Sequence, residues 1–344
     1  INSTNWIGID ISIDKIPLDL ATCTVKSFKR ILNMKKGYLE RSFVAALPNG
    51  KEIKVNIERF LSIVDDEIGT ISYTIIPLNF DGTISFTPYL DGDVENEDSN
   101  DNIKFWQELQ KETTQNEHYL AMKTKKLDFH IATGMTYVVT QNNKPVKVRT
   151  KKIEKRKYIA STFNVNVKKG QATTLYKYAA TVSSLNYSKK NLIDAAKISL
   201  KKAFKKGYKN LKKEQIAAWA KKWKESDIII DGDVAAQQAI RFNIFQLNQT
   251  YTGEDERLNI GPKGFTGEKY GGSTYWDTEA YCIPFYLSTA DQKVAKNLLI
   301  YRYKHLARAI ENAQKLGFKN GAALYPMVTM NGEECHNEWE ITFE

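Results

Sequence analysis

The chain has 344 residues, of which 42% are hydrophobic and 26% are charged, with a net charge of +10. This length predicts about two domains, and the absence of an apolar run of roughly 18 residues or of an N-terminal signal predicts a cytoplasmic protein that does not span a membrane. The three cysteines are odd in number and far apart, which argues against a disulfide framework or a thiolate metal site.

Lysine-rich segments at 144–157 and 189–224 carry much of the positive charge. Apolar residues interleave with the lysines at strand or helix spacing, so we interpret these segments as solvated faces, with polyanion binding as the weaker alternative, and expect no nucleic-acid partner. The acidic stretch 91–101 is interpreted as a solvated loop. Its spacing does not match an EF-hand, which leaves calcium as a minor alternative.

Residues 1–185 show short runs in which every second residue is apolar. The runs are Ile53 to Ile57, Ile71 to Ile75, Ile84 to Phe86 and Phe163 to Val167. Period-two patterns separated by turn residues indicate half-buried strands, so this part of the chain is predicted to form a large antiparallel β-sandwich domain.

From residue 186 the apolar period becomes helical. Ser188 is a suitable N-cap for a first helix carrying Leu192, Ala196, Leu200 and Ala203, and a second helix with Ile216, Trp219 and Trp223 follows Gly207. These two helices are predicted to form a linker over residues 186–224.

Residues 225–344 alternate predicted helices with long loops. One helix is expected from about Asp233 to near Tyr251, a glycine-rich loop at 264–279, and a second helix from Ala295 to Leu316 that stops at Gly317. This rhythm is typical of a barrel of helical hairpins. Only its opening portion is expected here, and we interpret the chain as a piece of a longer polypeptide.

The loop ends in Tyr275, Trp276 and Asp277, with Glu279 close behind. An indole packs on the C–H face of a pyranose and a carboxylate accepts from two neighbouring sugar hydroxyls, so Trp next to Asp is a compact binding unit for a hexose. We predict that Tyr275, Trp276 and Asp277 bind substrate and that Glu279 supports them.

Carboxylates gather again near the end of the sequence, around His336. His336 and Glu340 are four residues apart, but the pattern is not His-Glu-x-x-His and supplies few ligands, so no metal site is expected. Glu334, His336 and Glu340 are predicted to line the substrate site, with a capping or solvated helix start as the alternative. Glu334 is the fallback candidate for a catalytic acid.

Several segments together carry a specific resemblance. Ile260–Glu268, Tyr275–Glu279, Tyr301–Tyr303 and Gly332–Glu344, with Asn33–Arg41 upstream, resemble the phosphorylases of glycoside hydrolase family 65 in the same order. The resemblance implies a β-sandwich of unusual size (a super-sandwich), a helical linker and an (α/α)6 catalytic barrel. It also implies that Trp276 and Asp277 hold the glucosyl ring, and that the chain forms a homodimer.

The reaction implied by the resemblance is reversible, inverting phosphorolysis of maltose to β-D-glucose 1-phosphate and glucose. Inorganic phosphate is then a co-substrate, and no cofactor is expected. The family's catalytic glutamic acid belongs to a motif that this sequence lacks, so no catalytic residue is expected within the chain. Alternatives are phosphorolysis of trehalose, kojibiose or nigerose, a trehalase-type hydrolase, and a sugar-binding protein without catalysis.

Overall fold

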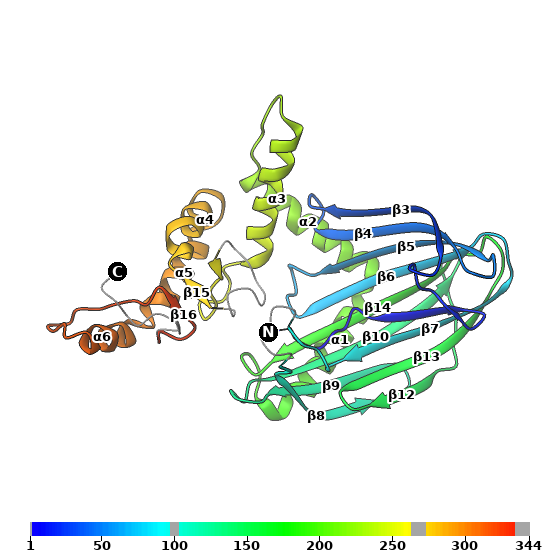
Figure 1. Cartoon of the computed structure of the whole chain (residues 1–344), viewed down its shortest axis with the longest axis horizontal. Coiled ribbons are helices and arrows are strands. Elements are labelled where there is room, and N and C mark those ends of the chain that lie inside the picture. The colour runs from blue at the N-terminus through cyan, green and yellow to red at the C-terminus, as the bar shows by residue number, and fades with distance from the viewer. Residues whose placement is uncertain (1, 97–102, 263–272, 334–344) are drawn as a thin grey trace. The chain divides into compact units, whose positions relative to one another are not determined.

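A computed structural model describes residues 2–96, 103–262 and 273–333, and element labels follow Figure 1. The chain separates into two compact units. The N-terminal unit comprises Ser3–Glu95 and Asn102–Ala218, and the C-terminal unit consists mainly of Trp219–Glu344. The domain boundaries predicted at residues 185 and 224 refer to functional domains and not to these compact units, so they stay predictions.

The N-terminal unit contains two antiparallel sheets. The five-stranded sheet has the order β12-β13-β7-β1-β2; the nine-stranded sheet runs β3-β4-β5-β6-β14-β10-β9-β8, with β11 paired to β10. Their strands are β1 (Ile9–Ile13), β2 (Ile16–Pro17), β3 (Thr24–Asn33), β4 (Tyr38–Ala46), β5 (Glu52–Leu61), β6 (Ile68–Pro77), β7 (Gly82–Asp91), β8 (Trp106–Thr113), β9 (Glu117–Thr124), β10 (His130–Gln141), β11 (Lys144–Pro145), β12 (Lys151–Lys155), β13 (Tyr158–Val167) and β14 (Thr173–Ser183).

The period-two runs of the sequence are confirmed as β5, β6, β7 and β13. Their alternate residues are buried because each strand turns one face toward the opposite sheet. In β7, for example, Ile84, Phe86 and Leu90 are fully buried. The facing rows form one large core between the sheets.

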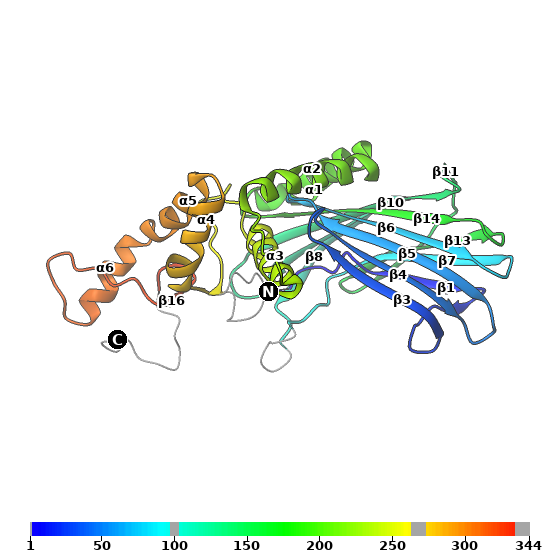
Figure 2. The same cartoon turned by 90° about the horizontal axis from the view of Figure 1, so that it is seen from above.

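Two helices follow the sheets: α1 (Leu192–Lys206) lies in the N-terminal unit, and α2 (Tyr208–Ser226) passes from this unit into the C-terminal unit at Trp219. Leu192, Ala196 and Leu200 of α1 pack with the outer face of the nine-stranded sheet, which gives a second core and a third layer (Figure 2). The predicted cap is corrected. Ser188 precedes a short 3-10 turn, Lys189–Asn191, and its side chain accepts no capping hydrogen bond, so the α-helix starts only at Leu192.

In the C-terminal unit, the helix predicted from about Asp233 is confirmed as α3 (Val234–Thr250), and the Asp233 carboxylate caps it by accepting from the Ala236 amide at 2.9 Å. The single helix predicted for residues 295–316 is wrong. Two helices occupy this region, α5 (Gln292–Tyr303) and α6 (Leu306–Lys315), because the His305 amide bonds to the Arg302 carbonyl at i−3 and tightens the turn between them. A further helix, α4 (Ile283–Thr289), was not predicted.

Gly253 connects α3 to the rest of this unit. Its φ is +76°, and a Cβ there would lie 2.6 Å from the Val294 Cα, so only glycine fits. The Asn297 side chain donates to the Gly253 carbonyl at 2.6 Å. Within the described residues, no helix has both the length and the apolar character that crossing a bilayer requires.

His118 is a buried titratable group in the inter-sheet core. Its Nε2 lies 2.5 Å from the Ser161 hydroxyl, and burial, with a smaller contribution from Lys152, lowers the pKa of His118 to about 4. The unfolded chain, with a histidine pKa near 6.5, therefore binds more protons than the folded chain between these two pH values. The free energy of unfolding is therefore not reduced by this group above about pH 6.5, and it falls as the pH drops from there toward 4, where the folded chain also takes up the proton.

We therefore expect the His118→Gln variant to lose less stability on acidification. Between about pH 7 and about pH 4.5, the free energy of unfolding of the wild-type N-terminal unit should fall by about 2 kcal/mol more than that of the variant. Urea unfolding of both proteins at the two pH values measures this difference. Equal losses in the two proteins would show that His118 is not the group responsible.

Candidate carbohydrate-binding site

Trp276 and Asp277 lie at the end of a short strand in the C-terminal unit. This strand, β15 (Thr274–Tyr275), pairs antiparallel with β16 (Val328–Thr329). The Trp276 side chain is 43% exposed, whereas Asp277 and Tyr275 are half-buried. The indole is thus available to a ligand, and the carboxylate beside it is partly shielded from water.

The backbone changes direction at this pair. A π-helix, Thr278–Cys282, starts directly after Asp277 and continues into α4. The Trp276 carbonyl accepts from the amides of Glu279 and Ala280, both at 3.0 Å. Single π-turns are rare and occur frequently at functional sites because they insert a residue into a helix and redirect its side chains.

Arg302 of α5 holds the segment from Tyr275 to Glu279 in place. Its Nε and Nη2 donate to the two oxygens of Glu279 at 2.8 and 3.1 Å, and Nη2 also donates to the Tyr275 carbonyl at 2.9 Å. The Arg302 side chain is only 9% exposed. This bidentate ion pair fixes the chain on both sides of Trp276 and Asp277, and it gives Glu279 a structural contact, while its supporting role toward substrate stays a prediction.

A second anchor ties the π-helix to the preceding loop. Thr278 is fully buried, and its hydroxyl donates to the Ile260 carbonyl at 2.9 Å. On the other side, the Tyr301 hydroxyl donates to the Met330 carbonyl at 2.5 Å. The loop at Ile260 and the loop at Met330 are therefore each hydrogen-bonded to a helix of this unit, the first to the π-helix and the second to α5.

The carboxylates of the site differ in their environment. Glu279 is neutralised by Arg302, whereas no described residue forms an ion pair or hydrogen bond with the Asp277 side chain. Burial raises the pKa of the Cys282 thiol to about 11, and the charges of Asp277 and Glu279 add to this shift. Asp277 is thus the carboxylate free to accept hydrogen bonds from a ligand, and Cys282 stays an unreactive thiol.

The structure brings together four of the predicted site residues: Tyr275, Trp276, Asp277 and Glu279. The predicted loop at 264–279 is corrected at its end, where β15 and the π-helix replace irregular structure because Arg302 and Thr278 order the backbone. Glu334, His336 and Glu340 lie outside the described residues, so their roles stay predictions. Among the residues that are described, no group of three His, Cys, Asp or Glu side chains could hold a metal ion.

Sequence reasoning assigned no role to Arg302. Its signal was nevertheless present, because Arg302 follows Ala295 and Leu298 at helical spacing on the buried face of α5. Two cavities in the N-terminal unit, of about 390 and 410 Å³, were also missed, and neither includes Trp276 or Asp277.

Comparison with known proteins agrees with this organisation. A maltose phosphorylase of Bacillus subtilis (strain 168) is 43% identical over 344 residues, covering 100% of this chain and 44% of the relative. An alpha,alpha-trehalose phosphorylase of Thermoanaerobacter brockii is 33% identical over 95% of this chain and 42% of its own length. The chain therefore spans less than half the length of these curated relatives.

Among solved structures, a putative kojibiose phosphorylase from the human microbiome superposes with a TM-score of 0.87 and 30% identity, over 98% of this chain and 43% of that one. This similarity confirms the predicted β-sandwich, helical linker and first part of an (α/α)6 barrel. Residues 1–222 match the glycosyl hydrolase family 65 N-terminal domain, and residues 241–344 match the central catalytic domain of the same family. The chain belongs to glycosyl hydrolase family 65.

Proposed function

We propose that the complete protein is a disaccharide phosphorylase that converts maltose and phosphate into β-D-glucose 1-phosphate and glucose with inversion. The observation that carries this proposal is the pairing of an exposed Trp276 indole with the Asp277 carboxylate, which has no ion-pair or hydrogen-bond partner among the described residues. Family membership and the 43% identity to a maltose phosphorylase support the reaction class and the choice of maltose.

In this proposal, the glucosyl ring packs its C–H face on Trp276 while two of its hydroxyls donate to Asp277. The Arg302 fork keeps the backbone of the pair in one position before substrate arrives. Fixing the ring in this way lowers the barrier, because the entropy of orientation has been lost before the chemical step.

Inversion requires an acid on the departing glycosidic oxygen and a nucleophile on the opposite face of the ring. Phosphate enters as an anion, so it needs no general base, and one carboxylic acid is enough. We expect that acid outside this chain, with Glu334 as the fallback, and we expect Glu334, His336 and Glu340 to contact the substrate. We also propose that the complete protein forms a homodimer.

Two specific alternatives have support among the relatives. Trehalose and kojibiose phosphorylases also resemble the chain across most of its length. These substrates differ in the hydroxyl of the acceptor glucose that is linked, and a single hydrogen-bonded hydroxyl can discriminate strongly between them.

The test is an assay of the complete protein on maltose, trehalose, kojibiose and nigerose, each with and without phosphate. We expect glucose 1-phosphate and glucose in equal amounts from maltose, and no sugar release when phosphate is left out. Glucose release that does not depend on phosphate would identify a hydrolase. Turnover of another disaccharide in preference to maltose would reassign the substrate, and binding without turnover would leave only a sugar-binding protein.

A further inference from the structure

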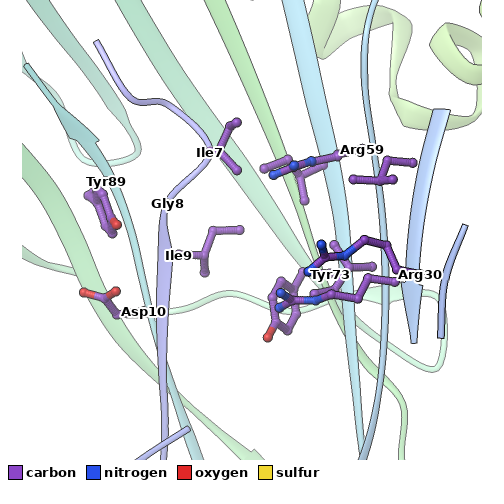
Figure 3. A pocket seen from close by; sticks show the side chains of 12 residues that line it. Ile7, Gly8, Ile9, Asp10, Arg30, Arg59, Tyr73 and Tyr89 are labelled. Atoms are coloured by element: carbon purple, nitrogen blue, oxygen red, sulfur yellow. The ribbon is translucent and has the colours of Figure 1, made fainter. Parts of the chain in front are cut away.

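One of the two cavities in the N-terminal unit has an unusual charge. It encloses about 390 Å³ between Ile7–Asp10 at the start of β1 and the inner face of β3 to β6. Figure 3 shows Ile7, Gly8 and Ile9 on one side and the guanidinium groups of Arg30 and Arg59 reaching toward them from the other. Arg41 also lines this space.

The arginines occupy positions that continue the rows of the inter-sheet core. Along β4, Arg41 lies two residues before Phe43, which belongs to that core. Along β5, Arg59 follows Ile53 and Val55 with the same period of two. Side chains two residues apart share a face of a sheet, so charged groups here take places that the fold otherwise fills with apolar side chains.

Strand register draws the three charges together. Arg30 of β3 pairs directly with Arg41 of β4, and Arg59 of β5 pairs with Leu39, two residues from Arg41. Directly opposite side chains lie about 5 Å apart at Cβ, and like charges in such pairs destabilise a sheet. The sequence therefore retains an arrangement that packing alone disfavours.

The described residues do not neutralise this cluster. None of the three arginines forms an ion pair with a described carboxylate; the Arg30 and Arg41 guanidiniums lie 5.7 and 5.5 Å from the ring centres of Phe28 and Phe43. Burial, followed by the charges of Arg41 and Arg30, lowers the pKa of Arg59. Arg41 and Arg59 are partly buried, whereas Arg30 is exposed, and partly buried cations without counter-ions favour binding of an anion.

A buried lysine that does not itself line the cavity holds the rim opposite the arginines. Lys177 of β14 is fully buried, and its Nζ donates to the Gly8 and Tyr89 carbonyls, each at 2.8 Å. It thereby fixes the backbone of the cavity rim. Among the described residues that line the cavity, only Asp10 is acidic, so positive charge exceeds negative charge around it.

We propose that this cavity binds a small dianionic ligand, in the first instance a phosphate monoester, whose anionic group is held by Arg30, Arg41 and Arg59. Guanidinium forks match phosphate and carboxylate oxygens in paired hydrogen bonds. Ile9, Ile57 and Ile71 supply an apolar wall for the body of the ligand. The volume lies within the range of small-molecule sites.

Titration calorimetry of the complete protein tests this site. The probes are glucose 6-phosphate, inorganic phosphate and succinate, which separate a phosphate monoester from free phosphate and from a dicarboxylate. We expect saturable binding of glucose 6-phosphate that becomes about 10- to 100-fold weaker in Arg41→Met and Arg59→Met. Arg156→Met, which removes an exposed arginine of the same unit outside the cavity, should leave the affinity unchanged.

Selective binding of succinate with the same dependence on Arg41 would support the dianion site and identify its ligand as a dicarboxylate and not a phosphate monoester. Inorganic phosphate is also expected to bind as the co-substrate at the catalytic site, so only binding that depends on the arginines counts. Absence of saturable binding of both glucose 6-phosphate and succinate, or affinities that do not change in Arg41→Met and Arg59→Met, would overturn the proposal.

A thermal measurement separates a ligand site from a structural charge cluster. In the absence of ligand, Arg41→Met should melt no lower than the wild type, because the substitution removes a like-charge pair. Glucose 6-phosphate should raise the melting temperature of the wild type but not of the variant. A fall of several degrees in the ligand-free variant would show that Arg41 serves the fold through its contacts with Phe43 and Tyr73 and not a ligand, and would overturn the proposal.

Discussion

Replacing Asp277 with Asn in the complete protein is expected to lower kcat/KM for maltose phosphorolysis by roughly 100- to 1000-fold. The amide keeps the size of the side chain but replaces one accepting oxygen by a donor, which opposes the sugar hydroxyls. Because no described residue holds Asp277 in place, the substitution should leave stability nearly unchanged. Initial rates and thermal melting of the purified variant measure both effects.

Asp231→Asn is the matched control, since Asp231 is an exposed carboxylate of the same unit. It should retain wild-type kinetics. Trp276→Ala should act differently from Asp277→Asn and mainly raise KM, because stacking on the indole contributes similarly to the ground state and the transition state. An Asp277→Asn enzyme with unchanged kcat/KM would remove this residue from the site.

The second large effect is expected from Arg302→Met. This change leaves Glu279 without its ion-pair partner and removes the hydrogen bond from Arg302 to the Tyr275 carbonyl, at a position where the arginine is 9% exposed. Breaking one side of a buried pair destabilises by about 3 to 5 kcal/mol. We expect a loss of this size in the free energy of unfolding of the C-terminal unit, together with a lower kcat, because the backbone of Trp276 and Asp277 loses its support.

A double-mutant cycle with Glu279→Met isolates the pair. The combined variant should recover much of the stability, since two apolar groups replace a buried ion pair at little net expense, whereas kcat should stay low. Arg308→Met provides the surface control. Its ion pairs with Glu311 and Glu333 are about half exposed and should contribute less than about 1 kcal/mol. Equal losses in Arg302→Met and Arg308→Met would contradict the anchoring role.

The β-sandwich could be predicted because burial between two sheets imposes a period of two on each strand. Ile53 and Val55 in β5, or Ile84 and Phe86 in β7, show that period directly in the sequence. The break between α5 and α6 could not be predicted. The segment from Arg302 to Leu306 contains no glycine or proline, and the break rests on backbone hydrogen bonds that no residue type announces.

The candidate site, too, could be predicted from the sequence only in part. Trp276 next to Asp277 suggested sugar binding because both residue types are adjacent in sequence and chemically complementary to a pyranose. The Arg302 fork joins residues 23 positions apart, so only the fold reveals it. The arginines of the β-sandwich were visible as charges within apolar rows, but strand register was needed to show that Arg30, Arg41 and Arg59 converge.

The most direct measurement of the central claim is a crystal structure of the complete protein with maltose and without phosphate. The non-reducing glucose should lie against the Trp276 indole, with two hydroxyls within hydrogen-bond distance of the Asp277 carboxylate and Glu279 still bound to Arg302. A disaccharide that is bound elsewhere, with Trp276 and Asp277 both free of sugar, would contradict the assignment of this pair as the glucose-binding site.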